Sequence, residues 1–286
     1  MMHSFGSNIF ETLGALEALK EEIKDTIIYN CFGSSSLLLF FKILGFTFKQ
    51  TFDILKDFNL AHTFINGYFI IPEDEEIKKN EIKSWLIQKM EIHNLISKEN
   101  NLEEIFKLTK IFPNFIVWSR KENKLICLNP KETPNVTLID CILATITCIG
   151  TFREHNLNED IISSYSVSTS YPYNLNFILD NKKINTLYIV HKSRFFFQET
   201  NDTGNPFSVI ENELLTQSIE SNNFTTTKLD LENLFMIYSD IYKNTFNDNK
   251  KNFCFDNGLK QGYNFKIGDC NDTYYKLRKI GIDNQR

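Results

Sequence analysis

The chain has 286 residues, a formal net charge of −5 and 42% hydrophobic residues, which is enough apolar content for one large or two small folded domains. Acidic and basic residues are interspersed, so the composition shows no basic face and argues against nucleic acid as a partner. The longest apolar run, Leu37–Phe41, is far shorter than the roughly 20 residues of a membrane-spanning helix.

The first 45 residues contain two strand-loop-helix units. In the first unit, a short apolar stretch and a Gly/Ser/Asn turn precede leucines at three-residue spacing over residues 13–19, which predict a helix. In the second unit, the strand-forming Ile27–Tyr29 leads through Gly33 into an apolar helix that ends near Gly45. Two consecutive units of this kind predict a parallel sheet covered by helices.

The middle of the chain mixes helices with a hairpin. Thr47 is a plausible N-cap for an amphipathic helix over residues 47–60, and the charged stretch 75–110 has the pattern of one long helix or two. Alternating apolar and polar residues over 114–130, on both sides of the sequence KENK, predict a β-hairpin. An apolar helix follows and is expected to end near Gly150.

In the last third of the chain, residues 184–193 are predicted to form a strand. Residues 228–246 have the pattern of a late amphipathic helix. No internal repeat or low-complexity linker interrupts the chain, so a single domain over residues 1–286 is predicted.

The six cysteines form no CxxC pair, and no histidine lies at a ligand-like spacing from any of them. Cys141 and Cys148 lie inside an apolar run, as small buried residues do, so we expect neither a metal nor a cofactor. Reduced thiols and the lack of a leader-peptide pattern favour a cytoplasmic protein. The many Ile, Asn, Lys and Phe residues suit AT-rich coding and suggest a large DNA virus or an AT-rich microbe as the source.

The stretch Gly33-Ser34-Ser35-Ser36-Leu37 admits two local interpretations. A serine between a strand and a helix can expose its hydroxyl beside the helix N-terminus, as the nucleophile of an acyl-transfer enzyme does. The three hydroxyls can instead cap the helix by accepting hydrogen bonds from its free N–H groups.

The order of these segments resembles that of the patatin-like phospholipases, which use a Ser-Asp dyad on a three-layer α/β/α fold with a mostly parallel central sheet. LGALEALKEE, residues 13–22, resembles the helix after the family's glycine-rich loop, and NCFGSSSLLLFF, residues 30–41, resembles the nucleophile strand, turn and helix. LNPKETPNVTLIDCILATITCIGTF, residues 128–152, resembles the segment that leads toward the dyad aspartate. The resemblance covers most of the chain.

The resemblance implies a site whose motifs are all degraded. Ser35 takes the nucleophile position in a turn that reads G-x-S-x-L where the family has G-x-S-x-G. Gly6, which alone remains of the family's G-G-G-x-x-G loop, and Ser36 would supply the oxyanion-binding N–H groups. The tripeptide starting at Ser164 stands where the family has D-G-G, and a serine cannot serve as general base at neutral pH. Asp160 is the nearest substitute carboxylate.

Three other polar residues have simpler interpretations. His155 and His191 are isolated in the sequence. Each is either an ordinary core or surface histidine, which is the favoured interpretation, or the base of a Ser-His arrangement. Asp140, at the start of an apolar helix, is expected to cap or order that segment.

The resemblance therefore implies a patatin-like protein with weak or no lipid acyl hydrolase activity, retained as a binding or assembly module. The alternative is an active hydrolase of the phospholipase A type that uses Ser35 with a relocated carboxylate base. The partners expected are a lipid or membrane surface bound peripherally, another protein, or a second copy of the chain.

Overall fold

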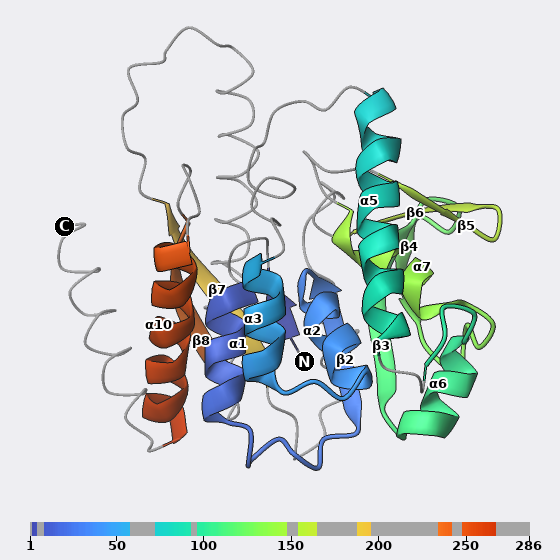
Figure 1. Ribbon diagram of the computed structural model, residues 1–286. Helices are drawn as coiled ribbons and strands as arrows, with labels where there is room; N and C mark the ends of the chain where they lie inside the picture. Colours follow the sequence, from blue (N-terminus) through green and yellow to red (C-terminus); the bar gives the residue numbers. More distant parts are fainter. Residues whose placement is uncertain are drawn as a thin grey trace, which may run out of the picture.

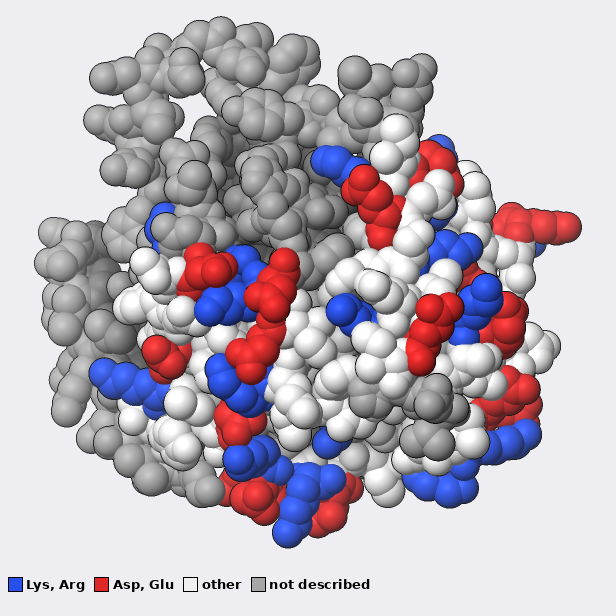
Figure 2. Space-filling view, in the orientation of Figure 1, with Lys and Arg blue, Asp and Glu red and all other residues white. Residues whose placement is uncertain are grey.

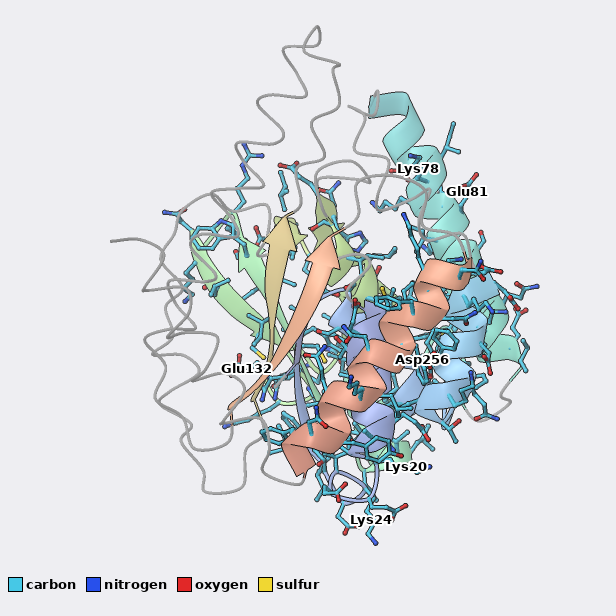
Figure 3. The ribbon with its side chains drawn as sticks, turned by 90° about the vertical axis from the view of Figure 1, so that its left-hand side faces the viewer. Lys20, Lys24, Lys78, Glu81, Glu132 and Asp256 are labelled. Atoms are coloured by element: carbon cyan, nitrogen blue, oxygen red, sulfur yellow. The ribbon has the colours of Figure 1, made fainter. Side chains whose placement is uncertain are left out.

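The computed structural model describes residues 2–4, 9–57, 72–92, 96–147, 154–164, 188–195, 234–241 and 248–266. These residues form a mixed α/β structure around one sheet of eight strands. Figure 1 shows the order of the elements, and Figure 3 shows helix α10 and the neighbouring N-terminal helices together on one side of the sheet.

Parallel pairing builds the centre of the sheet. Strand β1 (Met2–Ser4) lies between β2 (Ile28–Gly33) and β7 (Tyr188–Phe195). Strand β8 (Leu234–Ile241) extends the sheet beyond β7, and β3 (Phe112–Ser119) lies on the other side of β2. All four of these pairs are parallel, as the strand-loop-helix order of the sequence predicts.

Antiparallel strands extend the sheet beyond β3. Strand β4 (Lys124–Leu128) forms a hairpin with β3. Strand β6 (Asp160–Ser164) also pairs with β3, and β5 (His155–Leu157) pairs with β6. The sheet therefore has mostly parallel and some antiparallel strands.

Strands β2 and β6 share one edge of β3. Phe115 of β3 pairs with β4 and with Cys31 of β2, whereas Val117 pairs with β4 and with Ser164 of β6. A residue in a sheet has one neighbouring strand on each side, and β4 occupies the same side in both pairings. Strands β2 and β6 therefore follow one another along the other edge, and the Ser164 end of β6 lies just past the last β2–β3 pair.

Seven helices are described: α1 (Ile9–Ala18), α2 (Ser35–Ile43), α3 (Phe48–Asp57), α5 (Pro72–Glu91), α6 (Leu102–Thr109), α7 (Leu138–Ile146) and α10 (Asp248–Lys266). All residues of α2 except Lys42, and all of α7 except Asp140, are buried. These two helices are apolar almost all round because they pack between the sheet and other helices.

Helices α1 and α10, far apart in the sequence, pack closely through glycines. A Cβ atom at Gly14 would lie 1.9 Å from the carbonyl oxygen of Phe255, and one at Gly258 would lie 2.0 Å from that of Glu11. A Cβ atom at Gly262 would lie 2.6 Å from the Cβ of Ala18. The two helix backbones can approach this closely only because these positions have no side chain.

Helix α10 is also joined to α3. The buried Lys251 side chain donates a hydrogen bond from Nζ to the carbonyl oxygen of Lys56 (2.6 Å), in the last turn of α3. A cation at a helix C-terminus is favourable because the last carbonyl groups carry partial negative charge. The rings of Phe52 and Phe255 lie 4.3 Å apart between the same two helices.

Several predicted elements are confirmed. The alternating stretch 114–130 contains the hairpin of β3 and β4, and the charged stretch 75–110 contains two helices, α5 and α6. Thr47 caps α3, since its Oγ1 accepts a hydrogen bond from the Gln50 N–H (3.2 Å). Helix α2 ends two residues before Gly45, whose φ is +84°.

The helix predicted over residues 228–246 is wrong. Its described part, residues 234–241, is strand β8, which pairs along its whole length with β7. The sequence LFMIYSDI combines β-branched and aromatic residues, and an apolar run of this length suits a buried strand as well as a helix. The neighbouring strand decides between the two.

The apolar helix predicted to end near Gly150 is shorter than expected. Helix α7 ends at Ile146, and Thr147 has an extended backbone (ψ 129°). The last residues, Thr145 to Thr147, are all β-branched, which disfavours helix. Residues 148–150 lie outside the described part of the chain.

The close approach of α1 and α10 predicts that Gly14→Ala lowers the free energy of unfolding by about 1–3 kcal/mol, because the added methyl group overlaps the Phe255 backbone. Alanine has a higher helix propensity than glycine, so a loss of stability in this variant must come from packing. Urea denaturation measures the change in the free energy of unfolding. Glu17→Ala, on the same helix, is the control and should change the free energy by under about 0.5 kcal/mol. Equal effects would contradict the packing argument.

Candidate functional site

The chain turns from strand to helix at Gly33. Gly33 ends β2 with a φ of +55°, and Ser34 follows as the N-cap of α2 with φ −64°. Ser35 is the first residue of α2. A positive φ is unfavourable for a residue with a side chain, so glycine is suited to the centre of this turn.

The three serines after Gly33 are buried. Ser34 is 5% exposed, and Ser35 and Ser36 are 0% exposed. The Ser36 hydroxyl donates a hydrogen bond to the Gly33 carbonyl oxygen (2.8 Å), and the Ser35 hydroxyl is hydrogen-bonded to the Cys31 thiol. The Ser34 side chain makes no capping hydrogen bond to α2. The hydroxyls of Ser35 and Ser36 thus bind strand β2.

Cys31 lies beneath this turn and is fully buried. Burial raises the pKa of its thiol to about 12, opposed in part by a hydrogen bond with the Ser35 hydroxyl. At neutral pH the thiol is therefore protonated, and Cys31 is not a nucleophile.

Asp160, the substitute base suggested by the sequence, has hydrogen-bond partners at the hairpin of β3 and β4. Its Oδ2 accepts a hydrogen bond from the Ser119 hydroxyl, and its Oδ1 accepts one from the Lys121 N–H (2.9 Å). The Ser119 oxygen in turn accepts a hydrogen bond from the Glu122 N–H (3.0 Å). Asp160 therefore joins β6 to the turn that follows β3.

Asp160 and Ser164 are at opposite ends of β6. Ser164 is the end nearest β2, and the strand length puts the Cα of Asp160 about 13 Å further from it. Ser164, which the sequence predicts to stand at the dyad position, is thus beside the β2–α2 turn, and Asp160 is not. Gly6 and residues 165–187 lie outside the described part of the chain.

A His-Asp pair that the sequence did not indicate joins β5 to α7; its histidine is buried and its aspartate is partly exposed. His155 Nε2 lies 3.2 Å from Asp140 Oδ1, and His155 is 5% exposed. Thr137 caps α7 by accepting the Asp140 N–H (3.2 Å), and its hydroxyl donates to Asp140 Oδ2 (2.7 Å). Asp140 orders the start of α7, as expected. The pairing with His155 depends on how an edge strand packs on a helix, and no residue spacing signals it.

The His155 hydrogen bond is the main cause of a lowered pKa at Asp140. Burial acts in the opposite direction, while the Thr137 hydroxyl and the charges of His155 and Lys83 lower the pKa further. His155 Nδ1 is buried and has no hydrogen-bond partner in the described structure. The other predicted lone histidine, His191, is on β7, opposite Ile237 of β8.

Other chemical features are few. The described residues contain no group of three or more His, Cys, Asp or Glu side chains able to hold a metal ion. A hollow of about 310 Å³ lies along β4, on the edge of β3 away from β2, and its lining includes Glu122, Lys124, Cys127 and Glu132. Figure 2 shows charges of both signs interspersed on the visible face. Among the described helices, none combines the length and the apolar character needed to cross a bilayer.

No family model and no curated protein matches the sequence. Among solved structures, the chain is similar to VipD from Legionella pneumophila, with a TM-score of 0.52 at 10% sequence identity. The similarity covers 91% of this chain and 64% of the VipD chain. VipD has a patatin-like fold, and identity at this level is evidence of similar fold alone.

Asp160→Asn is expected to lower the free energy of unfolding by about 1–3 kcal/mol, because an amide cannot accept hydrogen bonds at both positions that Ser119 and Lys121 occupy. Chemical denaturation measures the loss. Glu154→Gln is the control, since Glu154 forms an exposed ion pair with Arg120 worth under about 1 kcal/mol. An Asp160 variant no less stable than the control would refute this role.

The lowered pKa of Asp140 predicts how stability depends on acidity. A carboxyl group whose pKa is lower in the folded state than in the unfolded state stabilises the protein at pH values above its ordinary pKa of 3.8. This stabilisation is lost as the pH falls through the folded-state pKa. The difference in unfolding free energy between the wild type and Asp140→Asn should therefore shrink from about pH 5 to about pH 2.

Denaturation at a series of acidic pH values measures this difference. Asp53→Asn is the control, because Asp53 pairs with Lys49 on an exposed helix surface. A difference for Asp140→Asn that stays constant over this range would be inconsistent with the pairing.

Proposed function

We propose that this chain is a non-catalytic protein of patatin-like fold, a single domain over residues 1–286 with the three-layer α/β/α arrangement. Its role is to bind or assemble rather than to hydrolyse lipid esters. Similarity of fold to VipD does not carry activity to this chain, because activity depends on the residues of the site.

The burial of Ser35 carries this proposal. A serine nucleophile must bring its hydroxyl oxygen to an ester carbonyl carbon, and it needs a base to take its proton. Ser35 is 0% exposed within the first turn of α2, and its hydroxyl is hydrogen-bonded to Cys31. A substrate could reach it only if the turn opened.

The candidate bases also support the proposal. Ser164, next to the end of β2, has no carboxylate, and both carboxylate oxygens of Asp160 accept hydrogen bonds from the hairpin of β3 and β4. A general base is worth about 10²–10⁴ in rate, and an oxyanion donor about 10²–10³. Without a base, hydrolysis by Ser35 would lie near the background rate.

We propose a protein surface, a second copy of the chain, or a lipid surface contacted peripherally as the partner. Sedimentation equilibrium of the full chain tests self-association. Co-sedimentation with phosphatidylcholine vesicles tests lipid contact. If the chain neither self-associates nor sediments with the vesicles, the proposed partner is a different protein.

Ser35→Ala should leave the release of fatty acid from phospholipid, and of p-nitrophenol from short esters, at the level of the wild type. Both proteins should release no more than a matched Ser34→Ala variant. A fluorophosphonate probe should give no adduct at Ser35 by peptide mass spectrometry. Ester hydrolysis that disappears in Ser35→Ala, together with an adduct at Ser35, would overturn the proposal in favour of an active hydrolase.

A further inference from the structure

We infer that the nucleophile position of the strand-to-helix turn is Gly33 rather than Ser35. On this assignment the turn keeps the geometry of a nucleophile elbow around a residue that has no side chain. The inference rests on the proposed patatin-like site and explains why that site would be catalytically inactive.

The backbone is the first observation. In a nucleophile elbow the nucleophile occupies the sharp, strained turn between a strand and the helix that follows. Gly33 has a φ of +55°, whereas Ser34 already has a helical φ of −64° and Ser35 lies within α2. The strained position is therefore Gly33, two residues before the serine that the sequence motif suggests.

The residues on either side of Gly33 are the second observation. An elbow needs small residues two positions before and two positions after the nucleophile, because strand and helix approach closely there. Around Gly33 these positions are Cys31 and Ser35, which are both 0% exposed and hydrogen-bonded to each other. This contact across the turn is centred on Gly33. If the motif were centred on Ser35, the residue two positions after the nucleophile would be Leu37, which is not small.

Exposure is the third observation. Gly33 is partly exposed, whereas each of the three serines after it is buried. The Ser164 end of β6 also lies beside the end of β2, opposite Val117 and two residues past the Cys31–Phe115 pair. The position of the missing base and the position of the missing nucleophile thus lie at the same end of β2.

Cysteine scanning tests this assignment without relying on enzyme activity. Gly33→Cys and Ser35→Cys variants of the full chain are treated with iodoacetamide under native conditions, and the modified peptides are quantified by mass spectrometry. Cys31, which is fully buried, is an internal reference for an inaccessible thiol. We expect Gly33→Cys to react at least about tenfold faster than Ser35→Cys, because a thiol at a helix N-terminus has a lowered pKa and this position is accessible.

The same reaction in denaturant is the control, and there the two variants should react at similar rates. Because Gly33→Cys places a side chain at positive φ, its melting temperature is measured first. If that variant does not fold, the modification rate of Ser35→Cys alone tests the assignment. If the introduced thiol of native Ser35→Cys reacts about as slowly as Cys31, the assignment is supported. If it reacts about as fast in the native protein as in denaturant, the assignment is overturned.

The two proposals fail in different ways. Fast modification of Ser35→Cys without any ester hydrolysis would overturn the assignment of Gly33 while the non-catalytic function stands. Hydrolysis that Ser35→Ala abolishes would overturn the non-catalytic function directly.

Discussion

The pairing of β3 on both of its edges is the constraint on which the candidate site depends. One edge is filled by the hairpin partner β4, so β2 and β6 must follow each other along the other. This arrangement brings the Ser164 end of β6 to the turn between β2 and α2. It also places Asp160 at the far end of β6, next to the hairpin of β3 and β4, where its carboxylate accepts the hydrogen bonds of Ser119 and Lys121.

Polar groups in the described core act mainly as structural links. Asp140 and His155 join α7 to β5, and Lys251 joins α10 to the end of α3. The hydroxyl of Ser35 binds Cys31 beneath the turn. Buried polar groups are stable when they are hydrogen-bonded, and the His155 and Lys251 links each join elements that are separated in sequence.

Local patterns predicted many of the elements correctly. The hairpin of β3 and β4, the Thr47 cap and the apolar helix α2 each depend on residues close in sequence, so alternation, capping and periodicity were sufficient. Strand β8 was predicted as a helix because a short apolar run does not reveal whether a neighbouring strand exists. The pairs Asp140–His155 and Ser119–Asp160 were missed because they join residues 15 and 41 positions apart through the packing of the sheet.

By itself, the sequence determined that a strand, a glycine, three serines and an apolar helix follow one another, because these depend on intrinsic backbone preference and on apolar periodicity. Only the tertiary structure decided which of these residues occupies the strained turn and which hydroxyls are buried. The reason is that φ at Gly33 and the exposure of Ser35 depend on how closely α2 packs against β2 within the surrounding core.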